Sequence, residues 1–318
     1  MTLSELYEKG AKILAEADYG LLLRGVETEF VLANNRRILD RYTFRQRCID
    51  AVRPETGCEI LGVALKTPIV MSAMTMPIPA IRQEGLRQVA EGLKAAGSLM
   101  WTGSPIPSNL KELVETGVPV AATVKPYEDR GQMFRDLERL QEAGARWIGL
   151  EIDVGQGTKI KDRRVVTGCA PLSTAELKEV RKRISAPLIF KGVLCREDAV
   201  KSVEIGADGI VLSNHGAHTI DYLPHPFQVM DEIVAAVRGK IAIIVDGGFR
   251  RGSDVLKGLA FGADLVGLGR PILWALAADG RDGVRSLIDE MTEELERIMG
   301  MVGAPTPNQV RREALIES

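Results

Sequence analysis

The 318-residue sequence contains few cysteines and shows no strong imbalance of charge. The four cysteines (Cys48, Cys58, Cys169 and Cys195) form neither a CxxC pair nor a dense framework, so a structural zinc site and a disulfide scaffold are not expected. The formal net charge is only −2 at pH 7, which provides no basic field for a nucleic-acid backbone. These absences favour a cytoplasmic protein with reduced cysteines, no metal and no nucleic-acid partner.

Long apolar runs are also missing. No segment approaches the roughly 18 apolar residues of a membrane-spanning helix, and the first residues lack the apolar stretch of a signal peptide. We therefore expect neither a membrane partner nor a targeting signal. With 45% hydrophobic and 26% charged residues, the composition is typical of a globular enzyme with a substantial core.

From residue 67 onward the sequence repeats a short apolar run, a break rich in Gly, Pro, Ser or Asp, and an amphipathic helical stretch. The expected strands cover residues 67–73, 97–103, 118–124, 147–153, 186–192, 209–215, 241–248 and 265–271. Their nearly continuous apolar character indicates burial on both faces, as in a parallel sheet. Eight such units predict an α/β fold, a (β/α)8 TIM barrel, with an open doubly wound sheet as the alternative.

The regions outside this repeat predict the remaining organisation. Residues 1–60 have helical periodicity, and we expect an N-terminal helical extension that covers the N-terminal side of the barrel. Residues 61–300 are assigned to the barrel, with its last helix at about 281–299. Residues 301–318 are expected to form a C-terminal tail.

In a TIM barrel the chemistry takes place where the strands end, and polar residues gather at these ends. Lys191 lies in an apolar strand, where a solvent-exposed lysine is the less favoured interpretation. His215 ends the sixth strand and suits general base catalysis near neutral pH. His218 and His225 follow within ten residues, and a structural and a functional role remain open for both. The absence of a neighbouring cysteine or an HxxxH helix disfavours a zinc site.

The seventh and eighth strands end in glycine and arginine. Asp246 to Gly252 reads DGGFRRG, and Gly267 to Pro271 reads GLGRP, each directly before a helix. Loops after these two strands bind phosphate in many barrels through glycine N–H groups, a helix N-terminus and an arginine. The pattern predicts a phosphorylated ligand, although a turn-forming role is available for either glycine pair.

Together with Ser213-Asn214-His215-Gly216, these motifs resemble the signatures of the FMN-dependent α-hydroxy acid oxidases and dehydrogenases, over most of the chain. The resemblance implies FMN as cofactor, His215 as the base, Lys191 beside the pyrimidine edge of the flavin, and a homo-oligomer, by family tendency a tetramer. It also implies a set of cofactor-binding residues: Ala73, Met74, Ser104, Thr123, Lys191, Ser213, Asp246, Gly248, Arg250, Gly269 and Arg270.

The residues that hold a 2-hydroxy acid in this family are not retained. His218 replaces the arginine that pairs with the substrate carboxylate, and the shortened segment around Gln156 lacks the second arginine. Leu21 and Lys125 stand in place of tyrosines, and Pro105 in place of a tryptophan. At two positions that contact the flavin, Thr123 replaces glutamine and Glu151 replaces threonine. Lys125 and His218 are the candidate substrate-binding residues.

Three functions are compatible with these residues. The first is an FMN-dependent oxidoreductase, a dehydrogenase or oxidase, that acts on a small molecule other than a simple 2-hydroxy acid. The second is an FMN-dependent isomerase of the type 2 isopentenyl diphosphate isomerase kind. The third, a flavin-binding subunit without catalysis, is less favoured because both His215 and Lys191 are present.

Overall fold

Eight parallel strands form one barrel. The computed structural model describes residues 1–17 and 19–318, without the side chains of Leu21 and Leu22. The barrel strands are β4 (Ile69–Met71), β5 (Met100–Thr102), β6 (Val120–Val124), β7 (Trp147–Glu151), β10 (Leu188–Lys191), β11 (Gly209–Leu212), β12 (Ala242–Asp246) and β13 (Leu265–Leu268). They pair in the order β4-β13-β12-β11-β10-β7-β6-β5, and the Met71 N–H donates to the carbonyl of Leu99 across the remaining gap. The TIM barrel is confirmed, and each strand lies inside its predicted range.

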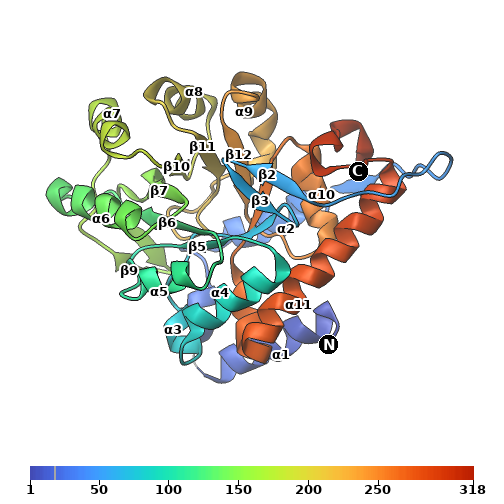
Figure 1. The fold of residues 1–318 in the computed structure, drawn as a ribbon, viewed down its shortest axis with the longest axis horizontal. Helices are drawn as coiled ribbons and strands as arrows, with labels where there is room; N and C mark the ends of the chain where they lie inside the picture. Colours follow the sequence, from blue (N-terminus) through green and yellow to red (C-terminus); the bar gives the residue numbers. More distant parts are fainter. Residues whose placement is uncertain (18) are drawn as a thin grey trace.

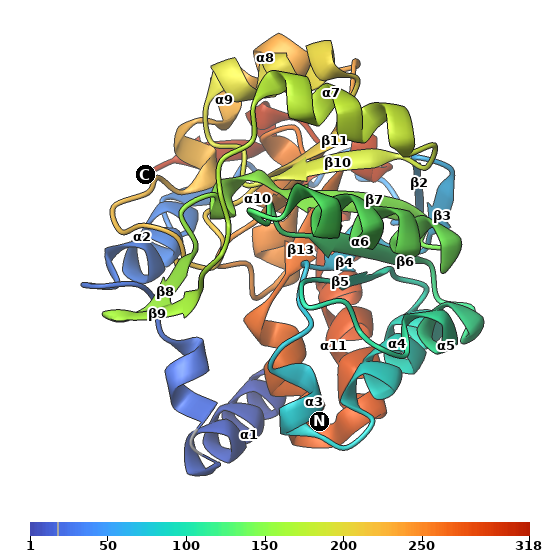
Figure 2. The ribbon, with the colours of Figure 1, turned by 90° about the vertical axis from the view of Figure 1, so that its left-hand side faces the viewer.

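Helices surround the barrel on its outside (Figures 1 and 2). They are α3 (Ile78–Ile81), α4 (Gly85–Ala96), α5 (Leu110–Glu115), α6 (Arg130–Glu142), α7 (Thr174–Arg183), α8 (Arg196–Ile205), α9 (Met230–Val237), α10 (Gly252–Ala260) and α11 (Arg270–Val302). Local sequence sets their ends: Ser173 and Glu176 form a capping box at the start of α7, and Gly97 ends α4 in the left-handed region at φ +71°. The largest apolar cluster packs between this ring and the strands.

The last helix begins earlier than the predicted 281–299. α11 is two helical segments joined at a kink, where Asp279 and Gly280 have non-helical backbone angles. The segment after the kink matches the prediction, whereas residues 270–278 add a short helix directly after β13. Such an extra helix commonly contributes its N-terminus to a barrel's phosphate site.

The N-terminal extension lies at the opposite end of the barrel from the one predicted. It comprises α1 (Leu3–Glu16), the 3-10 helix η1 (Tyr19–Leu23) and α2 (Phe30–Leu39). The Tyr7 hydroxyl of α1 donates to the carbonyl of Arg250, and Asn35 of α2 exchanges hydrogen bonds with Asn214. Both partners follow the carboxyl ends of strands. Helical periodicity specifies a buried face but not where it packs, and the polar strand ends provide the hydrogen-bonding partners for these helices.

An apolar hairpin closes the N-terminal end of the barrel instead. It consists of β2 (Cys58–Ile60) and β3 (Val63–Leu65), which pair antiparallel. Val63 and Leu65 pack into the inner core against Trp101 and Trp147, and the Trp147 indole donates to the carbonyl of Leu61. The barrel is therefore filled by side chains up to its mouth.

A second hairpin, β8 (Thr158–Ile160) and β9 (Arg163–Val166), follows β7 and lies beside the N-terminal extension (Figure 2). A bridge between Val26 and Lys161 connects the two segments. Near the C-terminus, β14 (Leu315–Glu317) pairs antiparallel with β1 (Tyr42–Phe44). The remaining elements are short 3-10 helices: η2 (Ile152–Val154), η3 (Pro226–Gln228), η4 (Pro307–Gln309) and η5 (Arg312–Ala314).

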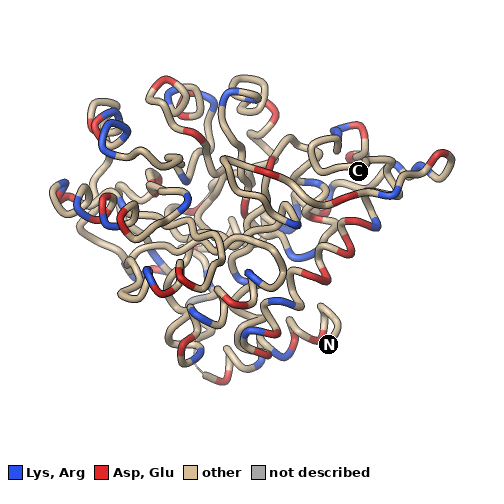
Figure 3. The backbone as a smooth tube through the Cα atoms, in the orientation of Figure 1, with Lys and Arg blue, Asp and Glu red and all other residues tan. Residues whose placement is uncertain are grey.

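Acidic and basic residues are interspersed over the molecule, as Figure 3 shows. In the described residues, no helix is both long enough and apolar enough to cross a bilayer. All four cysteines are free thiols, and the described residues contain no group of three side chains that could hold a metal ion.

Candidate active site

The mouth of the barrel contains a cavity of about 280 Å³. Residues at or directly after the carboxyl ends of all eight strands line it, because parallel strands bring these ends to one side. The β8–β9 hairpin adds Ile160 and Val165 to one wall. Most of the wall is apolar, and charged side chains are concentrated at the strand ends, as is typical of small-molecule sites.

His215 occupies a tight turn after β11. The backbone of His215, Gly216 and Ala217 has φ values of +55°, +61° and +67°, and the His215 N–H donates to Ser213 Oγ at 3.0 Å. The left-handed conformation is costly for the two non-glycine residues, His215 and Ala217, and such strain collects at functional sites. The turn holds the imidazole at the cavity wall.

Asp153 orients the His215 ring. Its Oδ2 is 2.8 Å from His215 Nδ1, and Lys191 Nζ is 3.1 Å from the same nitrogen. Since an ammonium group cannot accept a proton, we assign the Nδ1 hydrogen to the bond with Asp153. Nε2 then carries the lone pair, and within the described part of the chain it forms no hydrogen bond. Gly192 allows this approach, because a Cβ there would collide with the Asp153 carboxyl group.

Neighbouring charges keep both Asp153 and Lys191 ionised. Burial alone would raise the pKa of Asp153, but His215 and Lys191 bring it below its usual value. Burial would likewise lower the pKa of Lys191, yet Asp153, Glu151 and Asp246 raise it above the usual lysine value. A permanent cation therefore lies next to a carboxylate–imidazole pair at the cavity wall.

The end of the cavity formed by the segments after β12 and β13 suits a phosphate group. Gly269, at the N-terminus of α11, faces open space, since a Cβ there would meet no atom within 4 Å. The first turn of a helix leaves backbone N–H groups without intrahelical partners, and these groups bind anions. Arg270 lies in this turn, and two carbonyls hold its guanidinium, those of Leu23 (3.1 Å) and Gly216 (2.8 Å). Burial lowers the pKa of Arg270 to about 10, so it remains charged at neutral pH.

Trp274 provides a further donor at the same end. Its indole N–H is buried and has no hydrogen-bond partner among the described residues. The guanidinium carbon of Arg250 lies 5.4 Å from the centre of the indole ring. A buried donor without a partner is costly unless a ligand satisfies it. This unpaired donor, the open glycine and the arginines fit a phosphorylated ligand.

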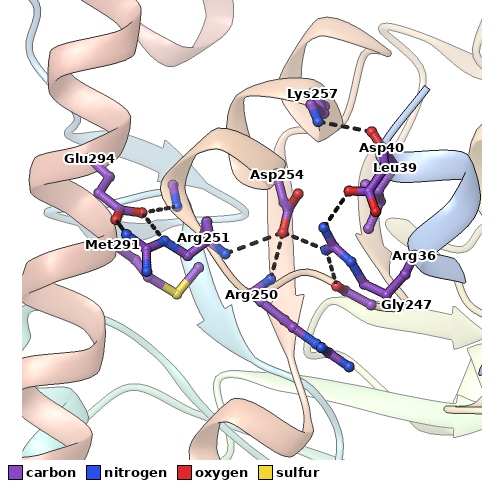
Figure 4. Close-up of polar contacts among 12 residues, drawn as sticks. Arg36, Leu39, Asp40, Gly247, Arg250, Arg251, Asp254, Lys257, Met291 and Glu294 are labelled. Atoms are coloured by element: carbon purple, nitrogen blue, oxygen red, sulfur yellow. Dashed lines mark hydrogen bonds and ion pairs between the residues drawn. The ribbon is translucent and has the colours of Figure 1, made fainter. Parts of the chain in front are cut away.

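Asp254 fixes the loop that carries Arg250. Its Oδ2 accepts hydrogen bonds from Arg36 Nη1 (2.7 Å) and from the backbone N–H groups of Arg250 (2.9 Å) and Arg251 (3.3 Å). Arg36 also donates to the carbonyl of Gly248. In Figure 4 the backbone N–H of Arg250 faces Asp254, while its side chain extends away from it. A helix of the N-terminal extension and the start of α10 thus hold the loop together.

We expect replacement of Asp254 by alanine to loosen this loop. The substitution leaves two backbone N–H groups without their acceptor and removes one of the acceptors of the half-buried Arg36 guanidinium, which should lower the free energy of unfolding by about 1–3 kcal/mol. FMN, the cofactor that the family resemblance implies, should also bind more weakly, because the loop is no longer preorganised. Urea unfolding and titration of the flavin-free protein with FMN measure the two effects.

Asp40 provides a matched control, since it also pairs with Arg36 at 2.7 Å but its side chain is 62% exposed. Its replacement by alanine should cost less than about 1 kcal/mol. Equal losses for the two variants would contradict the role of Asp254.

The structure brings most of the predicted site residues to the cavity. Those that line it are Ala73, Met74, Ser104, Lys125, Lys191, His215, His218, Asp246, Gly248, Arg250, Gly269 and Arg270. Thr123 and Ser213 do not line it, although both were expected to bind the cofactor. The Thr123 hydroxyl accepts a hydrogen bond from the Trp101 indole, and the Ser213 hydroxyl donates to Asp246. Both hydroxyls are satisfied inside the wall, so these residues position their neighbours.

His225 is structural. It is fully buried, donates from Nε2 to the carbonyl of Gly247 at 3.0 Å and accepts the Phe227 N–H at Nδ1. Two contributors were missed from the sequence, Asp153 and Trp274. Asp153 could have been found, because it ends the predicted strand 147–153, whereas Trp274 lies inside a helix and carries no signal. The side chain of Leu21, which replaces a family tyrosine, lies outside the described part of the structure.

Comparison with known proteins gives one consistent result. The family described as FMN-dependent dehydrogenase matches residues 11–168 and 159–317. Glycolate oxidase 3 of Arabidopsis thaliana is 32% identical, over 96% of this chain and 93% of its own length. L-lactate oxidase of Lentilactobacillus hilgardii is 28% identical, over 99% and 94%.

Solved structures agree with these relatives. A mandelate oxidase structure with a C4a-OH-FMN adduct superimposes with a TM-score of 0.91 at 30% identity, covering 99% of both chains. A mandelate oxidase variant with 2-hydroxy-phenylacetamide gives a TM-score of 0.90 at 30% identity, covering 99% of this chain and 97% of the other. The fold and these matches together show that the chain belongs to the FMN-dependent dehydrogenase family and is an FMN-dependent oxidoreductase.

Proposed function

We propose that this protein oxidises a hydroxyl- or amine-bearing carbon of a substrate other than a simple 2-hydroxy acid, with His215 as the base. The observation that carries the proposal is the contact of Asp153 with His215 Nδ1 at 2.8 Å, beside the buried cation Lys191. The other half of the proposal concerns the two arginines among the described cavity residues: Arg250 and Arg270 are assigned to the cofactor phosphate, which leaves neither for a substrate carboxylate.

The residues at the mouth fit FMN. We propose that Gly248, Arg250, Gly269 and Arg270 hold its phosphate, that Asp246 contacts the ribityl chain, and that the backbone of Ala73 and Met74 and the side chain of Ser104 lie along the ring. Lys191 would lie by the pyrimidine edge. When bound, FMN supplies the two-electron acceptor for the reaction.

Residues of this chain would then accept the proton that the substrate loses. His215 Nε2 accepts the proton from the substrate, and Asp153 stabilises the imidazolium that results through the bond to Nδ1. Lys191 provides a fixed positive charge where negative charge develops during the reaction. Because Asp153 is already hydrogen-bonded to His215, little reorganisation is needed.

The cavity cations that could replace the missing substrate arginine are occupied. Lys125 Nζ lies 3.1 Å from Glu151 Oε2, and Arg270 donates to two carbonyls. His218 Nε2 is 2.9 Å from the carbonyl of Arg24, and burial lowers its pKa to about 3, so it is neutral at neutral pH. A neutral substrate group suits this wall better than a carboxylate. The mandelate oxidase variant with 2-hydroxy-phenylacetamide contains such a neutral amide.

The rim of the cavity indicates an apolar substituent on the substrate. Met76 and Val165 both line the cavity and are 54% and 53% exposed.

An anaerobic screen of pooled hydroxy amides, hydroxy acids, amines and peptides tests the proposal, with bleaching of the flavin as the readout. If no pool of hydroxy amides, amines or peptides bleached a flavin that dithionite reduces, the proposed substrate class would be wrong.

We also propose a cytoplasmic location and a homo-oligomer, by family tendency a tetramer. Four free cysteines that form no disulfide are compatible with a reducing compartment. Fractionation of the source cells and light scattering of the purified protein test these two points.

The purified protein is expected to be yellow and to release FMN, and not FAD, on denaturation. The strand ends provide a single monophosphate site, and no GxGxxG motif follows the first strand. Absorbance spectra and chromatography of the released cofactor measure this. Release of FAD, or a colourless protein that takes up no flavin, would contradict the assignment of the phosphate end.

A further inference from the structure

Three buried charged residues stand side by side at the ends of neighbouring strands. Glu151 of β7 pairs in register with Lys191 of β10, and Lys125 directly follows Val124 of β6, which pairs with Leu150. Lys125, Glu151 and Lys191 are 8%, 2% and 3% exposed, and all three line the cavity. The row therefore has the charge order positive, negative, positive.

Glu151 has unused acceptor capacity. Its Oε2 lies 3.1 Å from Lys125 Nζ, but no donor among the described residues makes a hydrogen bond of good geometry to either oxygen. Burial would raise the pKa of Glu151, yet Lys125, His215 and Lys191 keep it below the usual value, so the carboxylate is ionised. A buried carboxylate with one ion pair and no hydrogen bond is poorly satisfied without a ligand.

We propose that Glu151 accepts an N–H of the flavin ring and, with Lys125, sets the reduction potential of bound FMN below the value that Lys191 alone would give. This inference needs bound FMN but not the substrate proposed above. By the family resemblance, position 151 contacts the flavin, and the neighbouring Thr123 uses its hydroxyl to accept from Trp101. Glu151 is an unsatisfied acceptor that pairs in register with Lys191, and a ring N–H is a donor that would satisfy it.

The effect on the potential follows from charge. Reduction of the flavin adds two electrons and one proton and leaves a negative charge on the ring, which the cation Lys191 stabilises and the carboxylate Glu151 opposes. Lys125 offsets part of this opposition. Removing Glu151 should therefore raise the reduction potential, and removing Lys125 should lower it.

The test is equilibrium reduction of the FMN-loaded protein by dithionite with reference dyes at pH 8.5, where Glu151 is ionised. For Glu151→Gln, the ratio of reduced to oxidised flavin at a fixed potential should rise about tenfold or more, equal to a shift of about +30 mV for two electrons. Lys125→Met should shift the potential in the negative direction, and the double variant should return toward the wild-type value. A general loss of packing would move both single variants the same way.

Two further variants complete the experiment. Glu151→Asp keeps the charge and should stay closer to the wild type than Glu151→Gln. Glu176→Gln removes a carboxylate that pairs with Arg130 and does not line the cavity, so its potential should equal the wild-type value. With ¹⁵N-labelled FMN, the ring N–H signal should move in Glu151→Gln and not in Glu176→Gln. An unchanged or lowered potential in Glu151→Gln, or shifts of equal sign in both single variants, would overturn the proposal.

Discussion

Replacement of His215 by alanine is expected to slow substrate-dependent reduction of the flavin by about 10²–10⁴-fold, the usual contribution of a positioned general base. The structure gives the reason. Asp153 accepts the Nδ1 hydrogen and leaves Nε2 as the basic atom at the cavity wall. Without the imidazole, the neighbouring Lys191 cannot take its place, because its pKa lies above the usual lysine value and it stays protonated.

Stopped-flow absorbance under nitrogen measures this reduction, and the flavin spectrum reports whether the variant still folds and binds FMN. His225→Ala is not a suitable control, since this buried histidine supports the Gly247 carbonyl and its loss should destabilise the fold. If His215→Ala reduced its flavin at the wild-type rate with the true substrate, the base would have to be another residue.

Glycolate, L-lactate and L-mandelate are expected to reduce the flavin slowly or not at all. A lost charge-assisted contact to a small carboxylate costs about 2–5 kcal/mol of recognition, or roughly 30- to 5000-fold. The structure strengthens this expectation, because His218 is neutral and Lys125 is paired with Glu151. Stopped-flow reduction with millimolar concentrations of each acid is the measurement.

His218→Arg should recover only part of this activity. The guanidinium would regain a bidentate contact, but Lys125 replaces one family tyrosine and Leu21 the other. Rapid, saturable bleaching of the wild-type flavin by any of the three acids would contradict the prediction. Lys125 would then be the first candidate for the carboxylate partner, and Lys125→Met would identify it by abolishing the bleaching.

The site was only partly predictable, and the reasons are physical. Lys191, His215 and the glycine–arginine ends of strands β12 and β13 were found because strand ends can be read from the alternation of apolar runs and breaks. That Ser213 does not line the cavity could not be read from the sequence, since residue type does not reveal that its hydroxyl is already bonded to Asp246. Trp274 was missed because an indole at helical spacing predicts only packing.

The sequence by itself determined the eight strands, the helices between them and the chemistry at the strand ends, because apolar periodicity is a local property. Only the tertiary structure decided which end of the barrel the N-terminal helices cover, since the partners Arg250 and Asn214 lie about two hundred residues away along the chain. The tertiary structure also decided which ionisable side chains are paired and which are neutral. Lys125, Asp153 and His218 acquire their roles from burial and from partners on other strands and loops, and neither can be read from a residue's own neighbours in sequence.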